Sequence, residues 1–159
     1  MIVSYSIGVN RPSVRDWRMC LVSTSTFPCH RSTTPQRARE FCVGFLREVF
    51  PGNSAARDVI DGCLLVVSEL GTNAVRAGSA MVGISVEVHR DHVRLAADDD
   101  GPGLPRPVAA HASDRRGRGL AIVDSLSRAW GVQPQPHGKR VWADVAIPSP
   151  IVVAVDCRL

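Results

Sequence analysis

Residues 81–105, "MVGISVEVHRDHVRLAADDDGPGLP", contain the pattern that decides the fold. Apolar and polar residues alternate on both sides of a short polar turn near Arg90-Asp91, which predicts two antiparallel strands joined as a hairpin. The second strand ends in three consecutive aspartates, and two glycines and two prolines follow within the next five residues. Glycine and proline interrupt regular structure, so the aspartates are expected at the end of a strand.

The middle aspartate is the unusual one. Side chains alternate between the two faces of a strand, so Val93, Leu95 and Ala97 share one face, which we expect to be buried. Asp99 falls on that same face, whereas its two neighbours point the other way. A carboxylate on an apolar face is costly unless hydrogen-bond donors reach it. The sequence names no protein partner, and a ligand with an amino group would serve; the alternative is a simple turn, in which Asp and Gly are common.

Elements expected on either side of this hairpin place it in an α+β fold. The segregation of strands and helices predicts a two-layer α/β sandwich, with helices on one face of a mixed, mostly antiparallel sheet. In "TTPQRAREFCVGFLREVF", Thr34 is expected to cap a helix that has Pro35 in its first turn. The other expected elements are a strand at 19–27, a helix at 55–77, a Gly/Pro/Arg/Asp-rich loop at 101–116, a helix at 119–129 closed by Trp130-Gly131, a turn at 133–138 and a last strand at 139–147.

The composition is that of one globular domain. The chain has 159 residues, 45% hydrophobic and 21% charged, which is sufficient for a single core. We assign residues 19–148 to the domain, residues 1–18 to an N-terminal arm and residues 149–159 to a C-terminal tail. The tail is either one more strand or a pairing segment for another molecule, which leaves a homodimer open.

Several classes of protein are disfavoured by the same composition. No stretch is long and apolar enough to span a membrane, and the N-terminus lacks the pattern of a signal peptide. The five cysteines are scattered without metal-binding spacing, which fits a reducing compartment, so we expect a cytoplasmic protein with no membrane partner. The net charge is +4, but the arginines are dispersed and only 5% of residues are aromatic, which argues against direct nucleic-acid binding.

A second candidate site lies on the long helix, in "SELGTNAV", residues 68–75. Glu69 and Asn73 are four residues apart, so they lie one above the other at the flank of the apolar stripe, at the rim of a cleft between helix and sheet. An amide oxygen can help to hold Mg²⁺, and a carboxylate can act as a general base. An exposed pair without a role is the alternative.

A third candidate is "RRGRGLAIV", residues 115–123. Gly117 and Gly119 precede an amphipathic helix, whose free N–H groups would face an anion. Arg115, Arg116 and Arg118 add positive charge at the same point. The segment is not a Walker A loop, because no Gly-Lys-Ser/Thr follows, and alone it is equally compatible with a flexible loop and a helix cap.

The three motifs in this order resemble the Bergerat-fold ATP-binding domain shared by histidine kinases, type II topoisomerases, heat-shock chaperones and DNA-mismatch proteins. The stretches "VVSELGTNAV", "DDDGPGLP", "GRGLAIVDSLSRAWGV" and "GKRVWADV" carry the resemblance, over about residues 20–148. They look most like the free-standing actinobacterial ATPases related to anti-sigma-factor serine/threonine kinases.

This resemblance implies a role for each motif. Glu69 matches the family's catalytic glutamate, Asn73 its Mg²⁺-holding asparagine, and Asp99 the aspartate that binds the adenine amino group of ATP. The remaining matched positions line the base pocket or the phosphates, and residues 105–116 match the ATP lid. They are Gly101 and Gly103 at the base, and Arg116, Gly117, Arg118, Gly119 and Leu120 at the phosphates.

Some positions depart from the family pattern. Ala77-Gly78 stand where the family usually has His-Ala, and Gly71 replaces a larger apolar residue. Arg140 stands where relatives often have a threonine that can help to hold the adenine end. These changes would weaken nucleotide binding without removing the main motifs.

The function implied is that of an ATP-binding regulator and protein serine/threonine kinase. Its partners would be ATP, Mg²⁺ and an anti-anti-sigma protein that it phosphorylates, with a sigma factor as the competing partner. The alternative is a non-catalytic regulator in which ATP only sets the conformation. Glu69 separates the two, because a pure binder needs no general base at that position.

Overall fold

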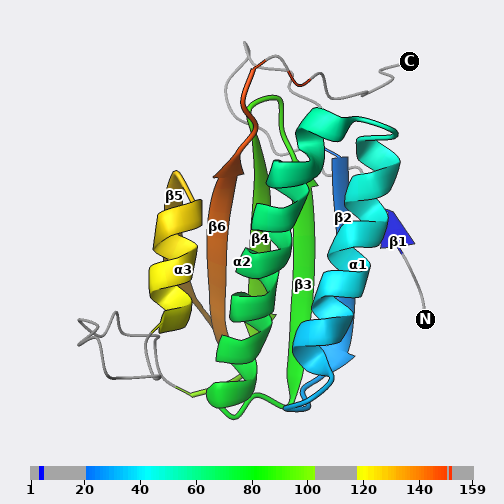
Figure 1. Cartoon of the computed structure of the whole chain (residues 1–159). Helices are drawn as coiled ribbons and strands as arrows, with labels where there is room; N and C mark the ends of the chain where they lie inside the picture. Colours follow the sequence, from blue (N-terminus) through cyan, green and yellow to red (C-terminus); the bar gives the residue numbers. More distant parts are fainter. Residues whose placement is uncertain (1–3, 6–20, 103–117, 150, 152–159) are drawn as a thin grey trace, which may run out of the picture.

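The computed structural model describes residues 4–5, 21–102, 118–149 and 151, and these form one sheet and one layer of helices (Figure 1). The secondary-structure elements, in chain order, are β1 (Ser4–Tyr5), β2 (Leu21–Pro28), α1 (Thr34–Val49), a single 3₁₀ turn (Ser54–Ala56), α2 (Arg57–Arg76), β3 (Met81–Val88), β4 (His92–Asp99), α3 (Arg118–Leu126), β5 (Ala129–Gln135) and β6 (Gly138–Ala146).

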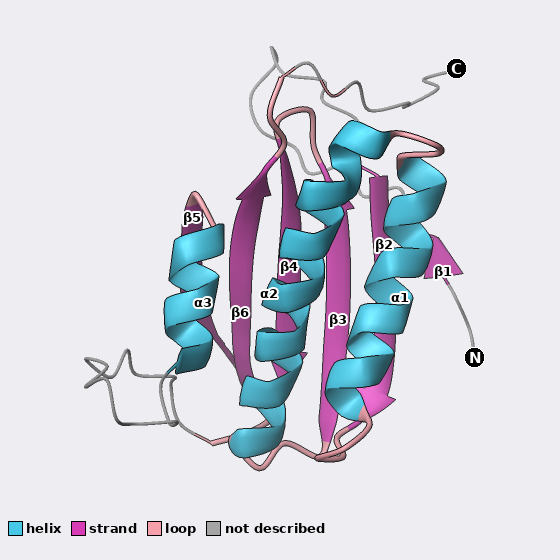
Figure 2. Ribbon diagram, in the orientation of Figure 1, coloured by secondary structure: helices cyan, strands magenta, loops and turns pink. Residues whose placement is uncertain are grey.

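The sheet has six strands in the order β1-β2-β3-β4-β6-β5, and every described pairing is antiparallel. All three helices cover one face of it, with α2 between α1 and α3 (Figure 2). The expected α+β sandwich is therefore confirmed. The strands β4 and β6, which carry Asp99 and Lys139, lie side by side, with β5 beyond β6 at the edge.

The hydrophobic core fills the space between the helices and the sheet. In β4, Val93, Leu95 and Ala97 are buried on the helix-facing side, as the alternation predicts, and Asp99 is buried with them. The apolar stripe of α2 packs against β4 and β6 on one side and against α1 and α3 on its flanks. The buried residues of α2 are Val59, Cys63, Val66, Val67, Leu70, Gly71 and Ala74.

Two expectations for the ends of elements are wrong. Residues 129–135 are not the close of a helix followed by a turn; they form β5, the outermost strand beside β6. Pro134 lies in this strand, and its missing N–H is tolerated there because an edge strand has an unpaired side. Thr34 is the first helical residue of α1 and not its cap, and its hydroxyl instead accepts a hydrogen bond from the backbone N–H of His30, at 2.7 Å.

The sheet face that no helix covers carries ion pairs between neighbouring strands. Arg94 on β4 donates two hydrogen bonds to Asp144 on β6, at 2.7 and 2.9 Å, and its guanidinium stacks over Trp142. Arg140 does the same to Asp98, at 2.8 and 2.7 Å. Since both pairs cross from β4 to β6, they reinforce the register of the two strands that carry the site.

No helix in the described part of the chain is both long and apolar enough to cross a membrane.

Candidate functional site

The site on α2 meets the start of α3. A β-carbon added to Gly119, in the first turn of α3, would lie 2.5 Å from Oε2 of Glu69 and 3.6 Å from Oδ1 of Asn73. The two side chains therefore converge on the N-terminal turn of α3, where backbone N–H groups have no intrahelical acceptor. Glu69 and Asn73, which the sequence predicted to be neighbours, thus lie beside this helix end, on the flank of α2 that α3 covers.

Asn73 has an unused donor. Its Nδ2 is buried and makes no hydrogen bond with any residue that the structure describes. A buried amide without a partner costs about 1–3 kcal/mol, so a ligand that brought an acceptor would stabilise it. The amide N–H of Asn73 can therefore donate a hydrogen bond to a polar ligand at the junction of α2 and α3.

Asp99 is the second part of the site, and it is almost completely buried, with 2% of its side chain exposed. Its Oδ1 accepts hydrogen bonds from the hydroxyl of Ser79 at 3.0 Å, the backbone N–H of Gly101 at 3.0 Å and the ammonium of Lys139 at 2.7 Å. No donor in the described residues contacts Oδ2. Three hydrogen bonds therefore fix the carboxylate of Asp99 through Oδ1, and Oδ2 is left to accept a hydrogen bond from a ligand.

Lys139 is a residue of the candidate site that was not predicted from the sequence. The sequence named no protein partner for Asp99, and the structure supplies one: the chain's single lysine lies directly opposite Asp99 in the β4–β6 register, with 4% of its side chain exposed. Its ammonium also donates to the carbonyl oxygen of Gly101, at 3.2 Å. The sequence did contain a signal: the single lysine alternates with Val141 and Ala143, so it falls on the buried face of the last strand. Only the strand pairing, however, brings it next to Asp99.

The departure expected at Arg140 is corrected by the same register. Arg140 lies on the opposite face of β6, paired with Asp98, and does not reach Asp99. The residue that stands beside the buried carboxylate is Lys139.

Glycines allow the backbone to close around Asp99. A β-carbon on Gly101 would lie 2.5 Å from Oγ of Ser79 and 2.9 Å from the carbonyl oxygen of Ala77, both too close. Gly138 has φ +134°, a conformation that L side chains rarely adopt, and a β-carbon there would collide with the carbonyl oxygen of Asp99. The strand ends and the end of α2 are thus packed backbone to backbone at this point.

The third aspartate has a structural role. Oδ1 of Asp100 accepts hydrogen bonds from the backbone N–H groups of Ala80 and Met81, at 2.9 and 3.4 Å. It therefore ties the end of β4 to the start of β3. The turn interpretation holds for Asp100, while Asp98 and Asp99 each pair with a cation from β6.

The last two turns of α2 join the halves of the site. Asn73 faces Gly119, and Ala77, one helical turn further on, lies against Gly101. The other predicted site residues are accounted for as follows. Leu120 is half-buried in the first turn of α3, Arg118 begins that helix, and Gly103, Arg116, Gly117 and the expected lid at 105–116 lie outside the described residues.

In this two-layer sandwich, two polar side chains of α2 face the N-terminus of α3, and the end of the same helix packs against a glycine-bounded strand end. The family described as histidine kinase-, DNA gyrase B-, and HSP90-like ATPase matches residues 58–149, more than half of the chain. The chain belongs to this family. No curated protein matches it.

The residues present fit a nucleotide at the phosphate end. The unpaired Nδ2 of Asn73 and the N-terminal N–H groups of α3, which have no intrahelical acceptor, suit an anionic ligand, and the absence of a side chain at Gly119 lets the backbone approach Glu69 and Asn73. At the end of β4, Oδ2 of Asp99 is an acceptor that no donor in the described residues uses. Lys139 adds a cation beside it.

Proposed function

We propose that this protein is an ATP-dependent regulator of the anti-sigma-factor type, which phosphorylates a serine or threonine of an anti-anti-sigma partner in the cytoplasm. Its ATPase domain spans residues 19–148, and a sigma factor competes with the anti-anti-sigma protein for the same chain. The observation that carries the proposal is the convergence of Glu69 and Asn73 on the first turn of α3. The family match supports the nucleotide, and the carboxylate beside the amide supports catalysis.

Each of these residues has one role in the proposed reaction. The amide oxygen of Asn73 helps to orient Mg²⁺, which neutralises charge on the phosphates of the substrate ATP when bound. Glu69 accepts the proton of the attacking hydroxyl as that oxygen bonds to the terminal phosphorus and ADP leaves. The N–H groups at the start of α3 bind phosphate oxygens and keep the transferred group in position.

Replacing Glu69 and Asn73 should affect different steps. General-base catalysis contributes about 10²–10⁴-fold, so Glu69→Ala should lose most phosphotransfer and keep its ATP affinity. Asn73→Ala should weaken Mg-ATP binding itself, because a metal ligand is lost. Asp61→Asn is the matched control, since Asp61 is an exposed carboxylate on the same helix, two turns before the site.

The experiment has two stages. Partners are co-purified from the native host, and each is then incubated with labelled ATP and the wild-type or variant chain, while ATP affinity is measured by calorimetry. Labelling of a partner's serine or threonine that depends on Glu69 supports the kinase. Tight ATP binding without labelling of a partner that demonstrably binds would contradict it.

The second candidate is a regulator in which nucleotide binding gates partner binding without catalysis. The observation that favours it is Lys139, which already occupies one oxygen of Asp99 and changes the base end of the site. In that case Glu69→Ala and wild type would be indistinguishable in every assay, and partner affinity would depend on nucleotide.

A further inference from the structure

The base end of the proposed nucleotide site contains a buried ion pair. Nζ of Lys139 lies 2.7 Å from Oδ1 of Asp99, and 4% and 2% of the two side chains are exposed. Removing either partner would leave the other charge buried and uncompensated, which is strongly destabilising. The two side chains therefore act as one unit.

This unit presents both a donor and an acceptor. An ammonium has three N–H groups, and two of those of Lys139 are used by Asp99 and by the carbonyl oxygen of Gly101. Oδ1 of Asp99 takes three hydrogen bonds, whereas Oδ2 takes none from the described residues. Within the described part of the chain, one donor of Lys139 and one acceptor of Asp99 are therefore left without a partner.

A carboxylate alone and a carboxylate with an ammonium beside it recognise different purine bases. A lone carboxylate accepts a hydrogen bond from the 6-amino group of adenine and repels the 6-carbonyl oxygen of guanine or hypoxanthine. A carboxylate with an ammonium beside it also matches the 6-oxopurines, which present a carbonyl oxygen next to an N–H group. It continues to match adenine, which presents an amino group next to a ring nitrogen that accepts.

We infer that Lys139 determines the base specificity of this site and broadens it from adenine to 6-oxopurine nucleotides. The inference rests on the proposed nucleotide site and names its substrate class: ATP, GTP and ITP all bind, and the ammonium donates to the 6-carbonyl oxygen of the last two. Neutralisation of the Asp99 charge by Lys139 acts in the same direction, because it removes the repulsion of that oxygen.

The test compares nucleotide affinities of the full chain by calorimetry with Mg²⁺ present. In wild type, the dissociation constants for GTP and for ITP should each lie within about tenfold of that for ATP. Lys139→Met keeps the hydrocarbon stem and removes the ammonium, so its preference for ATP over either 6-oxopurine nucleotide should rise by about tenfold or more, the size of one mismatched hydrogen bond. Arg140→Met is the control, because it removes a cation from the next residue on the opposite face, and its ratio should equal that of wild type.

The outcomes separate this inference from the proposed function. A wild-type preference for ATP above about tenfold overturns the inference, as does a Lys139→Met ratio equal to that of Arg140→Met. Wild type that binds no nucleotide overturns the proposed function as well. If thermal unfolding shows that Lys139→Met does not fold, the wild-type ratio remains decisive, and Lys139→Arg, which keeps a charged donor, should retain it.

Discussion

Three adjacent aspartates have three separate partners in this protein. Asp98 pairs with Arg140 on the open face of the sheet, Asp99 with Lys139 on the buried face, and Asp100 with the backbone at the start of β3. The alternation of a strand directs the first two to opposite faces, and the end of the strand frees the third. The three consecutive aspartates thus contribute to strand register, to the buried ion pair of the candidate site and to a turn.

Asp99→Asn should weaken nucleotide binding and the fold together. The amide keeps one acceptor oxygen but loses the charge that compensates Lys139, and its NH₂ group can face a donor. A mismatched buried polar contact costs about 1–3 kcal/mol, so nucleotide affinity should fall about ten- to a hundredfold. The free energy of unfolding should fall by about 3–5 kcal/mol, because the ammonium of Lys139 is left buried without its counter-charge.

Calorimetry with ATP and urea unfolding measure the two effects. Asp98→Asn is the control, because its partner Arg140 is only half-buried on the other face. It should lose little stability and no nucleotide affinity. Equal effects of the two substitutions would show that Asp99 has no special role.

At the scale of elements, α2 is the part of the molecule that connects the core to the site. Its apolar stripe faces the sheet, its C-terminal half carries Glu69 and Asn73, and Ala77 caps its end. Gly71 lies in the middle of this stretch, buried against the start of α1. A glycine inside a helix costs about 1 kcal/mol relative to alanine.

Gly71→Ala should stabilise the protein by about 1 kcal/mol. A β-carbon there would lie 3.7 Å from Cβ of Ala38, Cα of Pro35 and Cγ2 of Thr34, which are ordinary van der Waals distances. Gly44→Ala on α1 is the control, since its β-carbon would contact nothing within 4 Å and only helix propensity changes. Urea unfolding of both variants is the measurement, and a stabilised Gly44→Ala beside a destabilised Gly71→Ala would contradict the packing described.

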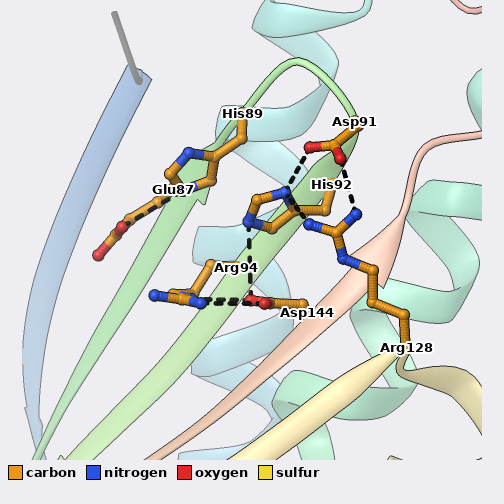
Figure 3. Close-up of polar contacts among 7 residues, drawn as sticks. All are labelled: Glu87, His89, Asp91, His92, Arg94, Arg128 and Asp144. Atoms are coloured by element: carbon orange, nitrogen blue, oxygen red, sulfur yellow. Dashed lines mark hydrogen bonds and ion pairs between the residues drawn. The ribbon is translucent and has the colours of Figure 1, made fainter. Parts of the chain in front are cut away.

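At the scale of the whole molecule, a polar network closes the end of the sheet opposite the site (Figure 3). Nδ1 of His92 lies 2.7 Å from Oδ1 of Asp91 and 2.6 Å from the guanidinium of Arg128, and its ring stacks on that of His89. Burial lowers the pKa of His92, while hydrogen bonds from Arg128 and His92 hold the pKa of Asp91 well below its usual range. The network joins the β3–β4 turn to the segment before β5.

Stability should decline in two stages as the pH falls. His92 has its pKa lowered in the fold, so its contribution is complete above the ordinary value of about 6.5 and is lost below it, when the unfolded chain takes up a proton more readily. Asp91 has its pKa lowered too, so its contribution persists above about 3.9 and is lost only in more acidic solution.

Urea unfolding between about pH 7 and pH 5 isolates the histidine, because the ordinary pKa of histidine, about 6.5, lies within that range, whereas that of aspartate, about 3.9, lies below it. His92→Gln should flatten the loss of stability in this range. His137→Gln is the control, because His137 is exposed in the turn between β5 and β6. An unchanged pH dependence in His92→Gln would contradict the assignment.

What the sequence determined by itself was local. The 3.6-residue period of α2, the alternation of β3 and β4 and the burial of Asp99 follow from the order of neighbouring residues, because each depends on which side chains share a face. Glu69 and Asn73 are paired for the same reason, being one helical turn apart.

The tertiary structure decided what lies opposite these faces. Edge strand β5 was missed because Pro134 and glycine weaken its pattern, and only pairing with β6 makes it a strand. Lys139 is 40 positions from Asp99 in sequence, and the antiparallel register of β4 with β6 brings them together. Such pairing is set by the whole sheet and its packing under the helices, so a buried carboxylate was predictable from sequence, whereas the ammonium that faces it was not.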